Sequence, residues 1–179
     1  GTLRGATVTI IGAGGIGRAL IPMLAALGAH VIAVSRSGRP VPGAVETLPV
    51  NRLGEIWSRT DHVVVAAPAT PATKHLIGAE ELAALRSTSW VINIARGSLI
   101  DTDALVAALA SNSIGGAGLD VTDPEPLPRD HPLLKLSNVT IAPHLGSATE
   151  QTRRLMAEIS VENLLLGLAG KPMRHEVKS

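Results

Sequence analysis

Short apolar runs of strand length recur along the chain, and they limit the possible folds more than any other feature. Most are nearly continuous in valine, isoleucine and alanine, whereas a strand with one face in water would alternate apolar and polar residues. This pattern is typical of strands covered on both faces. The predicted strands are Thr7–Ile11, His30–Val34, His62–Ala66, Trp90–Ile94, Gly116–Leu119 and Val139–Ile141.

Segments of helical character separate these apolar runs. They are Ile16–Leu27, Leu53–Arg59, Glu80–Leu85, Asp103–Ala110 and Glu150–Leu168. Strands that alternate with helices predict right-handed crossovers and a doubly wound parallel sheet, in the three-layer α/β/α arrangement of Rossmann-type folds. We expect Val139–Ile141 to be an inner strand of this sheet. The stretch Ser35–Leu48, which is rich in proline and glycine, is expected to be a loop.

Composition excludes several function classes. The only aromatic residues are Trp57 and Trp90, and the net charge is +1, so the chain lacks the stacking side chains and basic surface of nucleic-acid binders. The absence of cysteine excludes thiolate metal sites and fits a cytoplasmic protein. No histidine or carboxylate pair has the spacing of metal ligands. No apolar run approaches the roughly 18 residues of a membrane span. We therefore expect a cytoplasmic protein that binds no metal, nucleic acid or membrane.

The pattern G-x-G-x-x-G, formed by Gly12, Gly14 and Gly17, stands between the first predicted strand and the first predicted helix. In a dinucleotide-binding turn the first glycine permits a tight turn, the second lets backbone amides approach a pyrophosphate, and the third lets the helix pack on the strand. The helix N-terminus adds partial positive charge. The order strand, glycines, helix therefore predicts a dinucleotide site.

The end of the second predicted strand bears on which dinucleotide binds. NAD-binding versions of this fold place Asp or Glu there, to bond the 2′-hydroxyl of the ribose. This chain has Ser35 at that position and Arg36 after it. A carboxylate would repel a 2′-phosphate, whereas a hydroxyl can donate to it and a guanidinium can bind it with two hydrogen bonds. The sequence therefore favours NADP(H), with NAD(H) possible.

Charged side chains follow three of the later predicted strands. Arg96, Asp120 and His144 each come just after an apolar run, and Glu125 follows Asp120 between two prolines. The carboxyl ends of parallel strands lie at one edge of a sheet, where ligands bind. We expect these four residues to converge where a nicotinamide ring would lie.

This set of residues suits the reduction of a carbonyl group. Hydride transfer to a carbonyl carbon leaves an alkoxide that needs a proton, and His144 is the candidate general acid because histidine changes charge near neutral pH. A neighbouring carboxylate, Glu125, would stabilise the imidazolium and orient the ring. The guanidinium of Arg96 can bind a substrate carboxylate and polarise the keto oxygen. Asp120 is expected to receive the nicotinamide carboxamide.

Four motifs of the chain resemble those of one known family. In order they are "GAGGIG", "NIARGSLIDTDALVAAL", "AGLDVTDPEPLPRDHPL" and "APHLGSAT". They resemble the D-isomer-specific 2-hydroxyacid dehydrogenases, and within that family the glyoxylate/hydroxypyruvate reductases, which use NADPH. The resemblance implies that Arg96, Glu125 and His144 are the catalytic residues. The cofactor contacts that follow from it and from the glycine motif are Gly12, Gly14, Gly15, Ile16, Gly17, Ser35, Arg36, Ala67, Pro68, Thr73, Ile94, Ala95, Arg96, Asp120, His144 and Gly146.

The resemblance also concerns domains and assembly. Members of the family build a substrate domain mainly from chain that precedes the cofactor domain, so residues 1–179 are expected to be the NAD(P)-binding domain, without the substrate domain. Alone, this chain should bind cofactor and turn over little or no 2-keto acid. A homodimer is expected. Two alternatives remain open, namely an NAD-linked relative of the phosphoglycerate or lactate type, and a dinucleotide sensor without catalysis.

Overall fold

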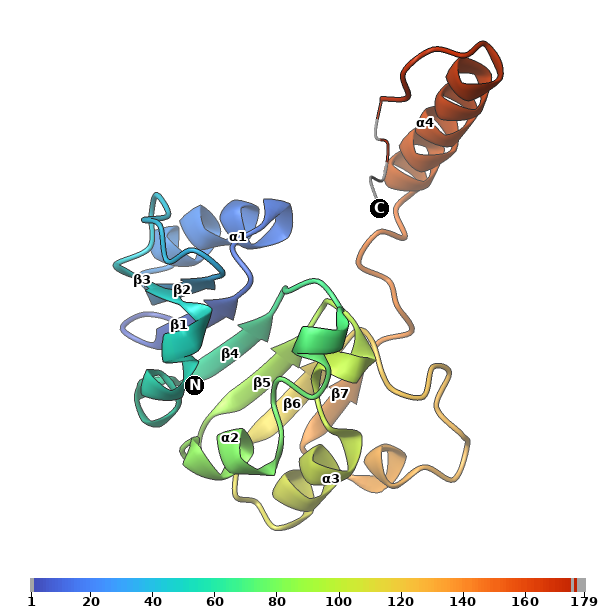
Figure 1. The fold of residues 1–179 in the computed structure, drawn as a ribbon. Helices are drawn as coiled ribbons and strands as arrows, with labels where there is room; N and C mark the ends of the chain where they lie inside the picture. The colour runs from blue at the N-terminus through green and yellow to red at the C-terminus, as the bar shows by residue number, and fades with distance from the viewer. Residues whose placement is uncertain (1, 175, 177–179) are drawn as a thin grey trace. The chain divides into compact units, whose positions relative to one another are not determined.

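The structure is a computed structural model that describes residues 2–174 and residue 176. The chain forms two compact units, Gly1–Pro143 and His144–Ser179. The first unit holds the sheet and the helices that cover it, and the second holds one long helix (Figure 1).

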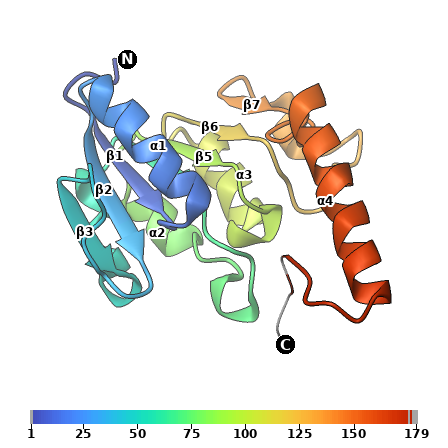
Figure 2. The ribbon, with the colours of Figure 1, turned by 90° about the horizontal axis from the view of Figure 1, so that it is seen from above.

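All strands of the first unit belong to one parallel sheet. They are β1 (Thr7–Ile11), β2 (His30–Ser35), β3 (Glu46–Pro49), β4 (His62–Val65), β5 (Trp90–Asn93), β6 (Gly116–Leu119) and β7 (Val139–Ile141). They lie in the order β3-β2-β1-β4-β5-β6-β7, which the labels of Figure 1 follow, and Figure 2 shows the two edge strands β3 and β7 on opposite sides of the sheet. The order reverses direction between β1 and β4, as in doubly wound sheets. The predicted parallel, Rossmann-type sheet is confirmed.

The helices cover both faces of this sheet. α1 (Gly15–Ala26) packs through Ile21 and Leu24 on one face, against Val8 and Ile10. α2 (Ala79–Ala84) and α3 (Thr102–Ala110) cover the opposite face, in front of the strands in Figure 1. Because side chains alternate along a strand, neighbouring residues of β1 serve the two different cores.

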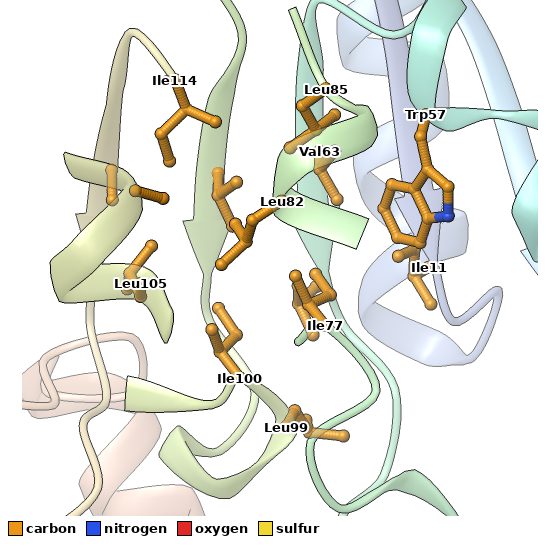
Figure 3. Close-up of a cluster of buried hydrophobic side chains, with 14 of the residues drawn as sticks. Ile11, Trp57, Val63, Ile77, Leu82, Leu85, Leu99, Ile100, Leu105 and Ile114 are labelled. Carbon is orange, nitrogen blue, oxygen red and sulfur yellow. The ribbon is translucent and has the colours of Figure 1, made fainter. Parts of the chain in front are cut away.

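The larger core is aliphatic apart from one indole. Figure 3 shows Leu82 of α2 and Leu105 of α3 facing the sheet, with Trp57 beside Ile11 at the β1 side. Five short 3-10 turns connect the elements, namely η1 (Val50–Glu55), η2 (Trp57–Arg59), η3 (Pro71–Thr73), η4 (Gly97–Leu99) and η5 (Pro132–Lys135).

Three sequence predictions differ from the structure. The predicted loop Ser35–Leu48 ends in a seventh strand, β3, which pairs with β2 at the sheet edge. The predicted inner strand Val139–Ile141 is an edge strand, because β7 pairs with β6 alone. The predicted helix Leu53–Arg59 is divided between η1 and η2, where Gly54 disfavours a continuous α-helix.

The second unit contains α4 (Glu150–Leu168), whose bounds agree with the prediction. The Thr149 hydroxyl caps it by accepting a hydrogen bond from the Thr152 N–H at 3.1 Å. After the helix the chain folds back, and the Arg174 N–H donates to Asn163 Oδ1 at 2.8 Å. In the part of the chain that the structure describes, no helix has the length and apolar character needed to cross a membrane.

Candidate active site

The carboxyl edge of the sheet is the natural place for a ligand in this fold. The chain leaves β1 towards α1 on one face and leaves β4 towards α2 on the other. These two departures separate the loops above β1 and β4, and a crevice forms between them. The sequence-predicted site residues of the first unit lie at the end of β2 or in the turns, loops and first helical turn that follow β1, β2, β4, β5 and β6.

The β1–α1 turn needs glycine at two positions for steric reasons. Gly12 has a φ of +107°, and a Cβ there would stand 2.5 Å from the Ala67 backbone nitrogen. A Cβ on Gly17 would collide with the Gly12 carbonyl, so α1 could not lie so close to β1. At Gly14 and Gly15, by contrast, no atom stands within 4 Å of an added Cβ. The backbone at the start of α1 therefore faces open space.

A cleft of about 560 Å³ lies above the crevice between β1, β4 and β5. Its lining residues are Gly14, Gly15, Ile16, Ala66, Ala67, Pro68, Ala69, Ile94, Ala95 and Arg96. A volume of this size is typical of small-molecule and cofactor sites. Half of the predicted cofactor residues thus line this one cleft, and Ala66 and Ala69 join them without having been predicted.

Arg18 is a candidate that the sequence reasoning missed. It lies in the first turn of α1, and its Nε donates to the Ala13 carbonyl at 3.1 Å. The side chain therefore folds back over the glycine turn and adds a cation where the helix N-terminus is already positive. The signal was present in the sequence, since an arginine follows the third glycine of the motif directly.

The end of β2 carries the predicted ribose residues. The Ser35 hydroxyl accepts a hydrogen bond from the Gly38 N–H at 3.1 Å, which shapes the turn after the strand. Arg36 and Arg39 are exposed, and neither forms an ion pair among the residues that the structure describes. These three residues are outside the lining of the cleft.

Arg96 stands after β5 and lines the cleft. Its side chain is exposed, and Nη1 donates to the Ala95 carbonyl at 2.7 Å. No carboxylate pairs with it within residues 2–174 and 176. A guanidinium in this state offers its donors to an anion that enters the cleft.

The predicted acidic residues lie on the connection that follows β6. Asp120 is half-buried, and its N–H donates to the Asn93 carbonyl at 2.9 Å. Glu125 is exposed, and one of its carboxylate oxygens accepts from the Thr122 N–H at 3.4 Å. Neither residue is in the lining of the cleft.

The remaining predicted residues are Thr73, His144 and Gly146. The Thr73 hydroxyl donates to the Pro68 carbonyl at 2.8 Å and so ties down the loop after β4. His144 begins the second unit, has a left-handed φ of 55°, and follows β7 by two intervening residues. Gly146 belongs to the same unit. Among the described residues, no group of three or more histidine or acidic side chains is arranged to hold a metal ion.

Comparison with known proteins gives the same family for most of the chain. Residues 1–146 match the family described as "D-isomer specific 2-hydroxyacid dehydrogenase, NAD binding domain". The chain is 43% identical over 177 residues to the glyoxylate reductase/hydroxypyruvate reductase of Homo sapiens, covering 98% of the chain and 54% of that protein. With glyoxylate/hydroxypyruvate reductase B of Yersinia enterocolitica it shares 42% over 166 residues, which is 92% of the chain and 51% of the relative.

Solved structures agree with these sequence relatives. The TT0316 protein from Thermus thermophilus superposes with a TM-score of 0.89 at 43% identity, over 98% of this chain and 55% of that one. The NAD-complexed D-isomer specific 2-hydroxyacid dehydrogenase of Lactobacillus delbrueckii ssp. bulgaricus gives 0.85 at 32% identity, over 97% and 56%. The chain thus spans about half the length of the relatives it matches. By sequence and by fold, it belongs to the D-isomer specific 2-hydroxyacid dehydrogenase family.

Proposed function

We propose that residues 1–179 are the cofactor domain of an NADP(H)-dependent dehydrogenase that reduces glyoxylate or hydroxypyruvate to the D-2-hydroxy acid. The observation that carries the proposal is the cleft at the β1/β4 crevice, which has the glycine turn in one wall and the unpaired cation Arg96 in the other. The chain covers about half of its relatives, so the proposal places the substrate domain outside these residues.

The residues of the cleft fit a dinucleotide. The open backbone at Gly14 and Gly15 and the N-terminus of α1 would bind the pyrophosphate, with Arg18 as a second cation. Apolar walls at Ile16, Ala67 and Ile94 would pack against the ribose and nicotinamide. The bound cofactor supplies the hydride. The proposal assigns the remaining contacts to Gly12, Gly17, Pro68, Thr73, Ala95, Asp120, His144 and Gly146.

The preference for NADP(H) rests on Ser35 and Arg36. The Ser35 hydroxyl oxygen already accepts a hydrogen bond from Gly38, so its proton remains available to donate to a phosphate. Arg36 is exposed beside it and lacks an acidic partner in the described part of the chain. A dianionic 2′-phosphate would gain two charge-assisted contacts here.

Arg96 is assigned the recognition of the substrate. Its guanidinium can bind the carboxylate of a 2-keto acid with two parallel hydrogen bonds and polarise the adjacent keto oxygen. Both effects orient the carbonyl carbon towards the cleft, where the hydride donor would lie. The same cation stabilises the negative charge that develops on the keto oxygen.

His144 is assigned the proton transfer, with Glu125 as its partner. As the hydride arrives, the carbonyl oxygen takes the electron pair of its π bond and needs one proton. The imidazolium of His144 would donate this proton and become neutral. The carboxylate of Glu125 would hold the ring in the required orientation and stabilise its charged form.

An NAD-linked dehydrogenase is the second candidate. It is favoured by one observation, namely that the Lactobacillus delbrueckii relative was solved in its NAD-complexed form. We also propose a homodimer, as the family resemblance implies, and a cytoplasmic location, which the cysteine-free composition supports.

Cofactor preference is tested with the full-length protein by titration with NADPH and NADH and by steady-state reduction of glyoxylate. NADPH is expected to bind more tightly and to give the higher kcat/KM. The double substitution Ser35→Asp and Arg36→Ser should move the preference towards NADH, because the new carboxylate repels the 2′-phosphate. Equal or tighter binding of NADH by the parent would favour the NAD-linked candidate.

The catalytic role of His144 is tested in the same protein. His144→Ala should lower keto-acid reduction on the order of 10²–10⁴-fold, the usual contribution of a positioned general acid. NADPH affinity should be retained, because the glycine turn that would bind the pyrophosphate is unchanged. A rate within a few-fold of the parent would contradict the assignment.

A further inference from the structure

Asn93, the last residue of β5, is one of the few polar side chains that are fully buried. It is 1% exposed, and its neighbours in the core are mostly apolar. A buried amide is costly unless its donor and acceptor are both satisfied. The partners of this amide therefore show what the side chain does in the fold.

Both halves of the Asn93 amide bond to the loop that carries Arg96. Nδ2 donates to the Arg96 carbonyl at 2.8 Å, and Oδ1 accepts from the Ala95 N–H at 3.0 Å. The side chain thus bonds to the loop at two successive residues. The Ala95 carbonyl, on the peptide between them, is the acceptor for Arg96 Nη1 at 2.7 Å.

The backbone of Asn93 is itself fixed by two neighbouring strands. It is in register with Val65 of β4 and Leu119 of β6, and its carbonyl accepts from the Asp120 N–H at 2.9 Å. Because the backbone of Asn93 is held in the sheet, the hydrogen bonds of its side chain fix the position of the Arg96 loop relative to the sheet.

The far end of the loop is fixed by a close backbone contact. A Cβ on Gly97 would collide with the Thr122 carbonyl and stand 2.5 Å from the Asp123 nitrogen. Close by, the Thr102 hydroxyl donates to the Asp123 carbonyl at 2.7 Å. Arg96 is therefore held by the hydrogen bonds of the Asn93 amide and, at the next residue, by the backbone contact of Gly97.

We infer that Asn93 is a positioning residue, which acts on substrate through Arg96 by holding the arginine loop at the wall of the cleft. The inference rests on the proposed function. An exposed arginine has many rotamers, and its guanidinium binds a carboxylate with two hydrogen bonds only when its backbone is placed correctly. Displacement by about 1 Å can cost on the order of 10²-fold in rate.

The substitution Asn93→Asp keeps the shape of the side chain and removes its hydrogen-bond donor. A carboxylate can still accept from the Ala95 N–H but cannot donate to the Arg96 carbonyl, which it instead repels. The cavity beside Asn93 measures about 10 Å³, which is at the lower limit for a single water molecule. There is room for at most about one water molecule to replace the lost donor.

Ser89 provides a matched control at the other end of β5. It directly precedes the strand, is 0% exposed, donates to the Thr60 carbonyl at 2.7 Å and accepts from the Arg86 N–H at 3.2 Å. Ser89→Ala removes buried hydrogen bonds of comparable kind and lies away from the cleft.

The experiment uses the full-length protein and compares Asn93→Asp, Asn93→Ala, Ser89→Ala and Arg96→Ala, with the double variant Asn93→Ala/Arg96→Ala. Steady-state kinetics with glyoxylate, NADPH titration and thermal melting are measured for each. We expect kcat/KM for glyoxylate to fall on the order of 10²-fold in both Asn93 variants. NADPH affinity should be retained, and Ser89→Ala should lower the melting temperature without changing kcat/KM.

The double variant decides between positioning and general stability. If Asn93 acts through Arg96, Asn93→Ala should cost no further kcat/KM once Arg96 is alanine, whereas independent effects would multiply. Multiplying effects, or Asn93 variants that behave like Ser89→Ala, would overturn the inference while leaving the proposed function standing. Asn93 variants that fail to bind NADPH would overturn it as well, since the residue would then serve the whole fold. If Arg96→Ala itself retains full turnover, the proposed role of Arg96 fails, and the inference with it.

Discussion

Two arginines at the amino edge of the sheet and two at its carboxyl edge have different kinds of partner. At the amino edge, Arg86 pairs with Asp61 at 2.8 Å, and the other carboxylate oxygen of Asp61 accepts from the Thr7 N–H at 2.8 Å. Arg59 pairs with Glu46 at 2.8 Å. At the carboxyl edge, Arg18 donates only to the Ala13 carbonyl in the turn before its helix, and Arg96 donates only to the Ala95 carbonyl in its own loop.

The difference separates residues that hold the fold from residues that are available to a ligand. An exposed arginine that bonds only to a nearby carbonyl contributes little to the free energy of folding. Its other N–H groups are exposed to water and remain available to a ligand. An anionic ligand would supply the missing partner. Arg59 and Arg86 already pair with carboxylates, and their contribution is structural.

The largest expected contrast comes from removing one arginine at each edge. Arg96→Ala should lower kcat/KM for the keto acid on the order of 10²–10³-fold, because a preorganised donor to the substrate is lost. Arg86→Ala should leave kcat/KM unchanged and reduce the free energy of unfolding by about 1 kcal/mol, through the lost pair with Asp61 and the lost bond to the Ser58 carbonyl.

Steady-state kinetics and urea unfolding of the full-length protein measure both effects. The comparison of the two edges would be wrong if the Arg86 variant lost as much turnover as the Arg96 variant.

A smaller contrast is expected within the glycine turn. Gly12→Ala forces a positive φ and a clash with Ala67, and should reduce the free energy of unfolding by about 1–3 kcal/mol. Gly14→Ala has room for the methyl group and an ordinary φ of −79°, so stability should be retained. The methyl group would enter the cleft and weaken NADPH binding.

Thermal melting with and without NADPH separates these two outcomes. Gly14→Ala should lose most of the stabilisation that the cofactor confers while its melting temperature without cofactor stays at the parent value. A large loss of stability in the Gly14 variant would show that this backbone does not face the ligand.

The smallest effect concerns a surface ion pair in η1, away from the cleft. The hydrogen bond from Arg52, at 2.6 Å, lowers the pKa of Glu55 below its ordinary value of 4.5. A lowered pKa in the folded state means that the pair stabilises the protein above pH 4.5 and that this contribution disappears as the pH falls through the lowered pKa.

Glu55→Gln should therefore lower the melting temperature slightly at pH 7, and the difference from the parent should vanish in acid. Melting curves of both proteins from neutral pH into the acid range test this. A difference that grows as the pH falls would reverse the sign of the argument.

The parallel sheet and six of its strands could be predicted from the sequence, whereas the two edge strands could not be identified as such. Continuous apolar runs predicted six strands and their parallel arrangement, because burial on both faces leaves a local signature. β3 lacks that signature, since only Leu48 among its four residues is buried and the strand ends in proline. The position of β7 at the edge could not be predicted either, because strand order is set by tertiary packing and leaves no trace in three residues.

The candidate site shows a similar division. The glycine turn was predicted from its spacing and Arg96 from its place after a strand, and Gly14, Gly15 and Arg96 line the cleft. Asn93 was not singled out, although it directly precedes "IAR" in the sequence. An asparagine at a strand end is ordinary, and only the folded chain reveals that its amide bonds the next loop at two points.

The contact at Gly97 has a consequence for protein engineering. Because the loop after β5 touches the backbone of the Thr122–Asp123 segment without an intervening side chain, neither loop can be exchanged alone. A chimera that takes the segment from Asp120 to Glu125 from a homologue should also take Arg96 and Gly97 from it, so that both contacting segments come from the same protein. The two loops form one module for recombination, and crossover points belong in the strands on either side of it.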